Sequence, residues 1–392
     1  MAVETVINTH GRVRSSLAIV RSLGRKGIRP VVGDSIYPAM SFFSRYCRSH
    51  FLYPSFKREP AFFLEHLSKV CDRIGARVLI PTYEETILLA HHKDKFPNLT
   101  IPVGNGETIS NVNDKGWLVR FGEDLGIPVP VTHMPRDVGE LKRLANKMEY
   151  PCVIKPAHGH GAGGVKYINS PEELRREYAR AVERSGEGLL IQAYIGGTGY
   201  GVSVLYNHGD MRAHFIHRRL REYPLTGGPS TYRESVHNDG LLKITKKLMD
   251  ELKWHGVAMV EYKIEERTQN PYLMEVNPRF WGSLPLALSS GVDFPYLLYQ
   301  IATEGDCPRT TQYRENIRSR WLLGDLRGLL KMIQEKKKLS SEYLKGFLRM
   351  GKSEKTDELA WDDPLPALIE PLIPIKNYLS SGSLRFTPQE EM

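Results

Sequence analysis

The feature that most constrains the fold is an alternation of strand and helix patterns over the first 110 residues. The strand patterns lie at 3–9, 29–34 and 76–82, and the helix patterns at 12–27, 60–75 and 84–95. Repeated strand–helix–strand units predict a parallel sheet with helices on its faces. Ligands of such sheets bind beyond the carboxyl ends of the strands. We therefore expect candidate site residues directly after the first and third strand patterns, at 9–11 and 82–85.

The pattern changes after about residue 111. Helix patterns at 113–126 and 137–148 flank a proline-rich connector, and short strands then surround a glycine-rich loop at 157–164. Ser170 and Glu173, with a proline between them, form a capping box that predicts a helix start. Farther along, 201–217 has the alternation of a β-hairpin that turns near Asn207. This second region is therefore expected to be α+β, and the tail from about residue 306 helical and basic.

Composition limits the class of protein and its partners. The chain has 392 residues, 41% hydrophobic and 25% charged, which suits two or three globular domains. A net charge of +9 favours anionic partners. The basic residues are mostly dispersed and no nucleic-acid-binding module is visible, so a small anionic ligand is favoured over nucleic acid. No apolar run approaches the roughly 18 residues that a membrane span needs.

Four cysteines are scattered without metal-binding spacing: Cys47, Cys71, Cys152 and Cys307. This usage is typical of reduced thiols in a cytoplasmic protein. The N-terminal residues lack the basic and apolar segments of a secretory signal. We therefore expect a cytoplasmic location and no association with a membrane.

The glycine loop carries the first chemical signal. GHGAGG at 159–164 fits G-x-G-x-x-G, but a strand pattern follows it where a dinucleotide-binding fold needs a helix. The loop is therefore expected to connect two strands, where glycines let backbone N–H groups approach phosphate oxygens. Lys155 directly precedes it and is a candidate phosphate ligand. The alternative is an ordinary surface turn beside a solvated lysine.

The second signal is a pair of carboxylates. Met274 and Val276 would share one face of a strand, whereas Glu275 and Asn277 would share the other. If the preceding hairpin turns near Thr268, Glu261 lies opposite Glu275. Like charges placed opposite each other are destabilising, unless a cation such as Mg²⁺ lies between them. The alternative is a solvated sheet face in which Arg279 forms a salt bridge.

The ordered motifs together resemble the ATP-grasp superfamily, especially the branch of carbamoyl-phosphate synthase and biotin carboxylase. The motifs are NDK at 113–115, VIKP with GHGAGGV at 153–165, LLIQAYI at 189–195, HRRLRE with TGGPS at 217–230, VEYK at 260–263 and MEVNPRFWGS at 274–283. The resemblance covers most of residues 1–305. It implies a Rossmann-like pre-ATP-grasp domain (1–112), a first ATP-grasp lobe (113–190), a second lobe (191–305) and a helical C-terminal extension (306–392).

The resemblance also implies roles for individual residues. ATP phosphates would meet Lys115, Lys155 and the loop residues Gly159, His160, Gly161 and Gly163. Adenine would pair with the backbone of Ala193 and Ile195, beside Gln192. Glu261, Glu275 and Asn277 would bind Mg²⁺, or Mn²⁺ in its place. Arg279 and one cation among Arg218, Arg219 and Arg221 would stabilise the phosphorylated intermediate.

The chemistry implied is ATP-dependent activation of a small-molecule carboxylate as an acyl phosphate, followed by attack of an amine. Glu85 is a candidate to pair with, or take a proton from, that amine. Many family members have an acid at the position of Gln192 and a second acid that holds ribose, so strict preference for ATP stays open. The alternatives are carboxylation, phosphorylation or thiol ligation by the same fold, and a non-catalytic nucleotide-binding protein. A homodimer is a further expectation.

Overall fold

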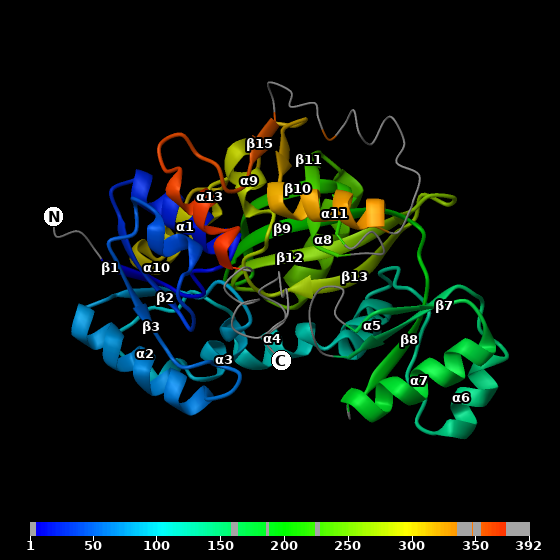
Figure 1. Cartoon of the computed structure of the whole chain (residues 1–392). Coiled ribbons are helices and arrows are strands. Elements are labelled where there is room, and N and C mark those ends of the chain that lie inside the picture. The colour runs from blue at the N-terminus through cyan, green and yellow to red at the C-terminus, as the bar shows by residue number, and fades with distance from the viewer. Residues whose placement is uncertain are drawn as a thin grey trace.

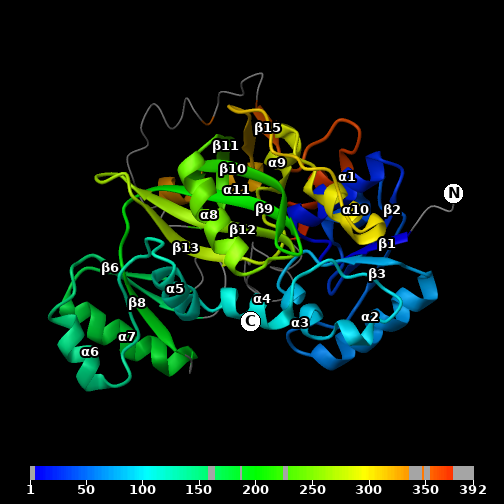
Figure 2. The same ribbon diagram turned by 180° about the vertical axis from the view of Figure 1, so that it is seen from behind.

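The computed structural model describes residues 5–157, 164–185, 188–223, 228–334, 347 and 354–373. The described part contains three sheets of four, seven and four strands. The N-terminal sheet and the lobe that follows it lie on either side of the large central sheet (Figure 1). The view from behind shows the same order, with helix α8 covering one face of the large sheet (Figure 2).

The N-terminal sheet is parallel, with strand order β3-β2-β1-β4. Its strands are β1 (Thr5–Asn8), β2 (Arg29–Asp34), β3 (Ser49–Leu52) and β4 (Val78–Ile80). Its helices are α1 (Arg14–Arg25), α2 (Pro60–Ile74) and α3 (Glu85–His91), with short 3-10 turns η1 (Met40–Phe43) and η2 (Lys93–Lys95). The predicted parallel sheet and its helices are confirmed. Strand β3 was not predicted, because it is a short, mostly exposed edge strand without an alternating pattern.

The following lobe is built on a mostly antiparallel sheet. Helices α4 (Gly106–Asn113) and α5 (Lys115–Asp124) lead into it, and α6 (Val138–Ala145) and α7 (Pro171–Ser185) pack on it. Its strands, in the order β5-β8-β6-β7, are β5 (Thr132–His133), β8 (Leu189–Ala193), β6 (Cys152–Pro156) and β7 (Lys166–Ile168). Ser170 and Glu173 cap α7: the Ser170 hydroxyl accepts from the Glu173 amide, and the Glu173 carboxylate accepts from the amide of Asn169.

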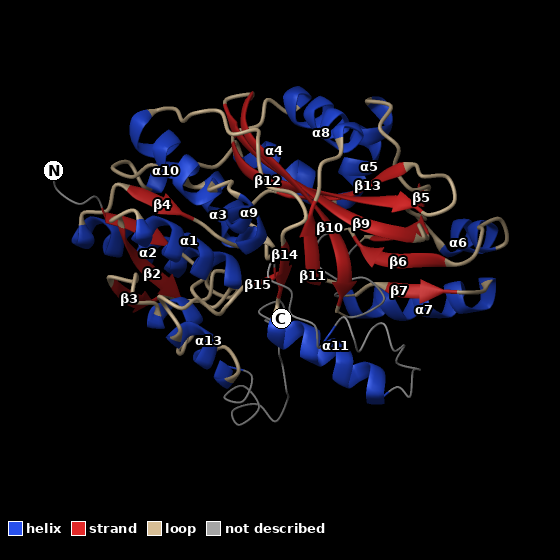
Figure 3. Ribbon diagram, turned by 90° about the horizontal axis from the view of Figure 1, so that it is seen from above, coloured by secondary structure: helices blue, strands red, loops and turns tan. Residues whose placement is uncertain are grey.

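The large sheet has the order β13-β12-β9-β10-β11-β14-β15 and is antiparallel except for its last pair. Its strands are β9 (Gly197–Asn207), β10 (Asp210–Glu222), β11 (Ser230–Ser235), β12 (Gly256–Glu265), β13 (Pro271–Asn277), β14 (Arg318–Arg320) and β15 (Glu354–Thr356). Viewed from above, this sheet occupies the middle of the molecule (Figure 3). The predicted hairpin near Asn207 is confirmed as the β9–β10 connection.

The two faces of the large sheet differ sharply, as strand alternation requires. On one face Val202, Val204, Ile216, Val260 and Val276 are buried in a core that includes residues of α8 (Asp239–Glu251). Residues one position away on each strand lie on the opposite face, which carries the carboxylates and glycines of the candidate site. The fold therefore fixes this polar face by burying the other one.

The C-terminal region is more than a helical tail. Helices α9 (Leu284–Ser290) and α10 (Phe294–Glu304) precede strand β14, and α11 (Leu322–Gln334) and α13 (Leu365–Ile369) follow it. Strands β14 and β15 extend the large sheet, so the expected helical extension supplies two strands as well. These strands have three residues each and are too short to produce a readable alternation. Within the described residues, no helix is both long and apolar enough to cross a membrane.

Candidate active site

The two predicted carboxylates meet as the hairpin register requires. Glu261 of β12 is the direct partner of Glu275 of β13. The Asn277 side-chain amide donates to both carboxylates, at 3.2 Å to Glu261 Oε1 and 3.0 Å to Glu275 Oε1. Burial and the neighbouring Glu275 raise the pKa of Glu261 to about 7, although Arg219 acts in the opposite direction. The site therefore concentrates negative charge that its own residues neutralise only in part.

This donor set suits a hard divalent cation. Mg²⁺ is commonly held by one or two carboxylates together with substrate phosphates. Within the described ranges, no group of three acidic, histidine or cysteine side chains gathers closely enough to hold a metal ion. Two opposed glutamates and an amide therefore fit a shared site that phosphate oxygens complete, and do not form a closed protein cage.

Two lysines face the carboxylates from the small lobe. Lys155 lies on β6 and Lys115 at the first position of α5, and both are buried. The Lys115 amide donates to the carbonyl of Ala157, which ties the start of α5 to the end of β6 (3.1 Å). Burial and neighbouring Lys115 lower the pKa of Lys155 to about 8, against the attraction of Glu275. The structure therefore brings the predicted phosphate ligands and Glu275 into one electrostatic environment.

The four predicted loop residues Gly159, His160, Gly161 and Gly163 lie outside the described residues. Of the loop, the described part includes only its flanks, at Ala157 and Gly164.

The three candidate arginines of β10 point in different directions. Arg219 forms an ion pair with Glu261 and donates to Glu222 (3.2 Å). Arg218, on the opposite face, pairs with Glu234 at 2.7 Å. Arg221 makes two hydrogen bonds to Asp325 of α11, at 2.7 and 2.5 Å. A register shift between Arg219 and Arg221 breaks the simple alternation of the strand.

Glu85 lies at the end of the N-terminal sheet, where strands β1 and β4 finish. Its Oε1 accepts hydrogen bonds from the Thr9 hydroxyl (2.5 Å) and from the backbone amides of Thr82 (3.0 Å) and Tyr83 (3.1 Å). The side chain is fully buried, with His10 Nδ1 3.8 Å from its Oε2. These contacts place Glu85 as an anchor for the two loops that follow β1 and β4.

Arg279 connects that anchored wall to the acidic strands. Its guanidinium lies over the ring of Tyr83, 4.7 Å from the centroid, and Tyr83 stacks on His10 at 4.6 Å. Its Nη1 donates to the carbonyl of Phe280 (2.9 Å), and the side chain is 9% exposed. Tyr83 and His10 fall within the expected site segments at 82–85 and 9–11. Their contact with Arg279 was not predicted, because it depends on the approach of distant segments.

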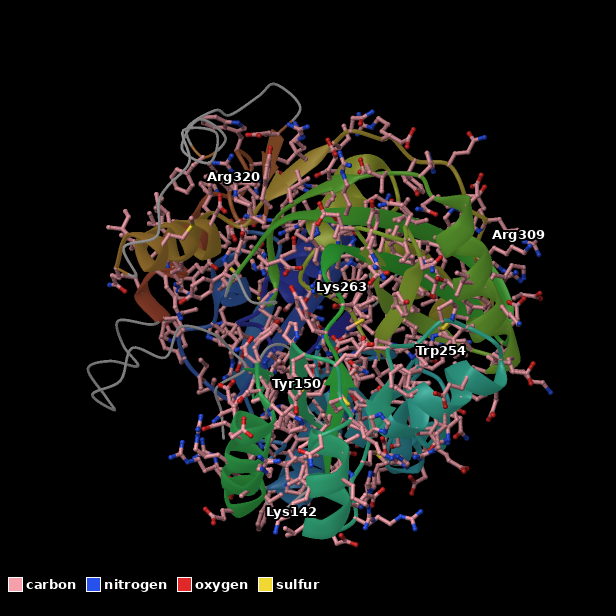
Figure 4. The ribbon with its side chains drawn as sticks, turned by 90° about the vertical axis from the view of Figure 1, so that its right-hand side faces the viewer. Lys142, Tyr150, Trp254, Lys263, Arg309 and Arg320 are labelled. Carbon is pink, nitrogen blue, oxygen red and sulfur yellow. The ribbon has the colours of Figure 1, made fainter. Side chains whose placement is uncertain are left out.

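The segment between lobe and sheet contains the residues predicted to hold adenine. The buried Gln192 side chain donates to Thr132 Oγ1 (2.7 Å), and the Ala193 amide donates to the carbonyl of Val131 (2.8 Å). Lys263 Nζ of β12 donates to the Ile195 carbonyl (3.2 Å). Figure 4 shows Lys142 and Tyr150 in the small lobe below Lys263, with Arg320 toward the upper left. Lys263 was not predicted, although it lies two residues from Glu261.

His217 is a further residue of the polar face that sequence reasoning did not assign. In the strand register it aligns with Gly201 of β9, which in turn aligns with Glu261. A Cβ at Gly201 would lie 2.3 Å from the His217 ring, and one at Gly199 would lie 2.9 Å from Arg219. The alternating glycines of GTGYG thus make room for His217 and Arg219. This two-residue spacing of glycines is visible in the sequence and could have indicated that large side chains of a neighbouring strand lie over β9.

Comparison with known proteins agrees with this geometry. Residues 185–324 match the family described as ATP-grasp in the biosynthetic pathway with Ter operon. The N-terminal section of the carbamoyl phosphate synthase large chain of Methanopyrus kandleri is 27% identical over 204 residues, covering 48% of this chain and 35% of that protein. The chain spans between 14% and 35% of the length of the curated relatives it matches, which include urea amidolyases.

Solved structures show the same fold. The biotin carboxylase domain of Hydrogenobacter thermophilus 2-oxoglutarate carboxylase has a TM-score of 0.65 and 20% identity, covering 80% of this chain and 73% of that one. The N5-carboxyaminoimidazole synthetase of Staphylococcus aureus also has a TM-score of 0.65, with 15% identity and 85% coverage of both chains. Together with the family match, these similarities support the resemblance to the ATP-grasp branch that includes carbamoyl phosphate synthase and biotin carboxylase.

Proposed function

We propose that this chain is an ATP-dependent carboxylate–amine ligase that releases ADP and phosphate. One observation carries the proposal: the Glu261–Glu275 pair, Arg219 and Lys155 converge from two lobes on one side of the large sheet. Carboxylates for a cation, lysines for phosphates and an arginine for developing charge are the parts that phosphoryl transfer needs. A protein that only binds a nucleotide has little use for all three.

We propose a division of the chain into four parts. Residues 1–112 form a Rossmann-like pre-ATP-grasp domain, and 113–190 and 191–305 form the two lobes that hold ATP between them. Residues 306–392 form the C-terminal extension. The parallel order β3-β2-β1-β4 and the separate cores of the two lobes support this division.

In this proposal ATP lies between the small lobe and the large sheet. Lys115 and Lys155 contact the phosphates. The Ala193 amide and the Ile195 carbonyl have partners within the protein, so adenine pairs with the Ala193 carbonyl and the Ile195 amide. Gln192 lies beside the base and supplies an amide where many relatives carry a carboxylate.

Glu261, Glu275 and Asn277 would hold Mg²⁺, or Mn²⁺ in its place. The cation, when bound, supplies charge neutralisation to the ATP phosphates. The protein holds the two carboxylates in register opposite each other and orients them through the Asn277 amide. Their mutual repulsion favours the ion-bound state.

The substrate carboxylate attacks the γ-phosphorus of ATP, which forms an acyl phosphate and releases ADP. Arg279 and Arg219 stabilise the negative charge of the transferred group. An amine then attacks the acyl carbon, an amide bond forms, and the carbon–oxygen bond to phosphate breaks. Arg218 and Arg221 are directed to Glu234 and Asp325, so we assign the catalytic cation of β10 to Arg219.

For Glu85 the contacts favour a positioning role. Its Oε1 is occupied by three hydrogen bonds, and it holds the loops that carry His10 and Tyr83 beneath Arg279. We propose that Glu85→Gln slows turnover by displacing Arg279 while nucleotide affinity is retained. Unchanged turnover would show that Glu85 has no role in the proposed site.

The partners in this proposal are a small-molecule carboxylate and an amine, with no nucleic acid or membrane. A homodimer is proposed from the biotin carboxylase domain of Hydrogenobacter thermophilus, which was described as a dimer. The four cysteines are free thiols, which suits the proposed cytoplasmic location.

The test is a product assay with Mg²⁺, ATP and pooled carboxylates and amines. ADP and phosphate that appear only when one acid and one amine are both present support the ligase. AMP and pyrophosphate would contradict the acyl-phosphate route. Glu275→Gln serves as the inactive control, and bicarbonate in place of the acid pool tests carboxylation by the same site.

A further inference from the structure

The polar face of the large sheet contains a buried histidine that the mechanism above does not use. His217 of β10 is 1% exposed and aligns, through Gly201, with the Glu261–Glu275 pair. It therefore lies in the same row of residues as the proposed cation site, two strands away from Glu261.

The surroundings of the ring are well defined. Arg219 follows it on the same face of β10, and Arg233 of β11 is the direct strand partner of Arg219. His217 Nε2 lies 3.4 Å from the Ser283 hydroxyl, on the segment that follows Arg279. Its Nδ1 is buried and has no hydrogen-bond partner among the described residues. Gly201 lies under the ring and admits no side chain without a clash.

These neighbours decide the protonation state of the imidazole. Burial, Arg219 and Arg233 all lower the pKa of His217 well below its ordinary value. The ring is therefore neutral at pH 7 and can accept a proton. Arg219, Arg233 and Arg279 are permanent cations, and Glu261 is engaged by Arg219 and Asn277. Among these groups His217 is the one suited to act as a proton acceptor.

We propose that His217, acting through the Ser283 hydroxyl, carries the proton that the attacking amine loses. This inference rests on the proposed ligase function and adds to it a route for the proton of the second half-reaction. Ser283 contacts the nucleophile, and His217 orients Ser283 and holds the proton.

The step balances without an additional reactant. The amine nitrogen forms a bond to the acyl carbon, and the carbon–oxygen bond to phosphate breaks, with its electron pair remaining on the phosphate oxygen. The amine proton passes to Ser283 Oγ while the Ser283 proton passes to His217 Nε2. The flanking arginines disfavour an imidazolium, so the proton returns through the same hydroxyl to the departing phosphate.

The test compares two nucleophiles on the same acyl phosphate. Hydroxylamine reacts with acyl phosphates without base assistance, whereas an ordinary amine needs its proton removed. In His217→Asn, amide formation is expected to fall about 10²-fold, the usual scale of general base catalysis. Hydroxamate formation from the same acid, ATP and Mg²⁺ is expected to stay within about threefold of the wild-type rate.

The matched control is His214→Asn, since His214 is a buried histidine of the same strand that lies beside Tyr313. It is expected to leave both rates unchanged. Equal losses of amide and hydroxamate in His217→Asn would overturn the inference, because they would indicate a structural role. Unchanged rates would overturn it as well.

A second variant distinguishes a loss of catalysis from a loss of folding. Ser283→Ala removes the relay hydroxyl and is expected to reproduce the loss of amide formation with hydroxamate formation retained. If neither product forms with the wild-type protein and any acid in the pool, the proposed ligase function itself fails. If both variants retain amide formation as well as hydroxamate formation, the proposed ligase function stands and only the proton route is rejected.

Discussion

Two charge clusters lie at opposite ends of the large sheet, and their charges are arranged in opposite ways. At one end Glu261 faces Glu275, and burial and the like charge raise the pKa of Glu261 to about 7. At the other end, Asp357 pairs with Arg14 and Arg233 and accepts from Ser319. There the two arginines outweigh the effect of burial and hold the pKa of Asp357 below its usual value.

This difference leads us to propose that the Glu261–Glu275 cluster serves a ligand, whereas the Asp357 cluster stabilises the fold. Opposite charges around Asp357 join α1, β11 and β14, so this cluster links the N-terminal domain to the sheet. Removing one partner of a buried ion pair leaves an uncompensated charge and is strongly destabilising. We propose that the Glu261–Glu275 pair instead serves a bound cation, because like charges placed opposite each other are destabilising. The comparison predicts that variants at the two ends separate activity from stability.

The largest effect is expected at Glu275. Glu275→Gln should reduce ADP formation by at least about 10²-fold, since it removes a charge that we propose acts on the bound cation and phosphates. Its melting temperature should equal or exceed that of the wild type, because the like-charge contact is relieved. Glu266→Gln, at an exposed position after β12, is the matched control. A Glu275→Gln protein of normal activity would rule out the cation site.

The arginines of β10 test which face of this strand carries the proposed site. Arg219→Ala is expected to lower kcat by about 10²-fold, as for loss of one electrostatic contact to the transition state. Arg218→Ala should remain within about threefold, because Arg218 pairs with Glu234 on the other face and is 44% exposed. Steady-state kinetics of the two variants compares the faces directly. The reverse order of effects would show that the strand face is misassigned.

At the other end the expected effect is on stability. Asp357→Asn should lower the free energy of unfolding by about 3–5 kcal/mol, the scale for breaking a buried ion pair. Thermal or denaturant unfolding measures this loss. Asp362→Asn is the control, since its ion pair with Arg25 is roughly half exposed on both sides and surface pairs contribute about 0–1 kcal/mol. Equal stability of the two variants would contradict the linking role of Asp357.

The smallest effect is a pH dependence specific to the acidic pair. Glu261 has a usual pKa of 4.5 and a folded-state pKa of about 7, so the folded state binds more protons between these values. Stability from this group is present below pH 4.5 and is lost as pH rises toward 7, by about 1–3 kcal/mol. The difference between wild type and Glu261→Gln isolates it from other carboxylates. Saturating Mg²⁺ and ATP should abolish that difference, because they compete with the proton.

Much of the active end could be predicted from sequence, for local reasons. Glu261 and Glu275 are equally far in sequence from the turn at Thr268, so a hairpin places them opposite each other. The structure has that register. The strand–helix alternation of the first 110 residues likewise predicts the parallel sheet, because each element is specified by its own periodicity. The resemblance to the ATP-grasp superfamily depends on such local motifs and is confirmed by the comparisons.

The choice among Arg218, Arg219 and Arg221 could not be made in this way. Arg218 pairs with a residue of β11, and Arg219 pairs with a residue of β12. The partner of Arg221 comes from α11, more than 100 residues later. The shift in register after Arg219 also breaks the alternation that sequence reasoning relies on. Likewise Asp357 meets Arg14 across 343 positions, and no local pattern encodes such a contact.

The amino-acid sequence by itself determined the elements, the opposed carboxylates and the glycines of β9, because periodicity and turn chemistry act over a few residues. Only the tertiary structure decided which charges are neutralised by the protein and which are left for a ligand. That outcome depends on burial and on partners from distant segments, which raise the pKa of Glu261 and lower that of Asp357.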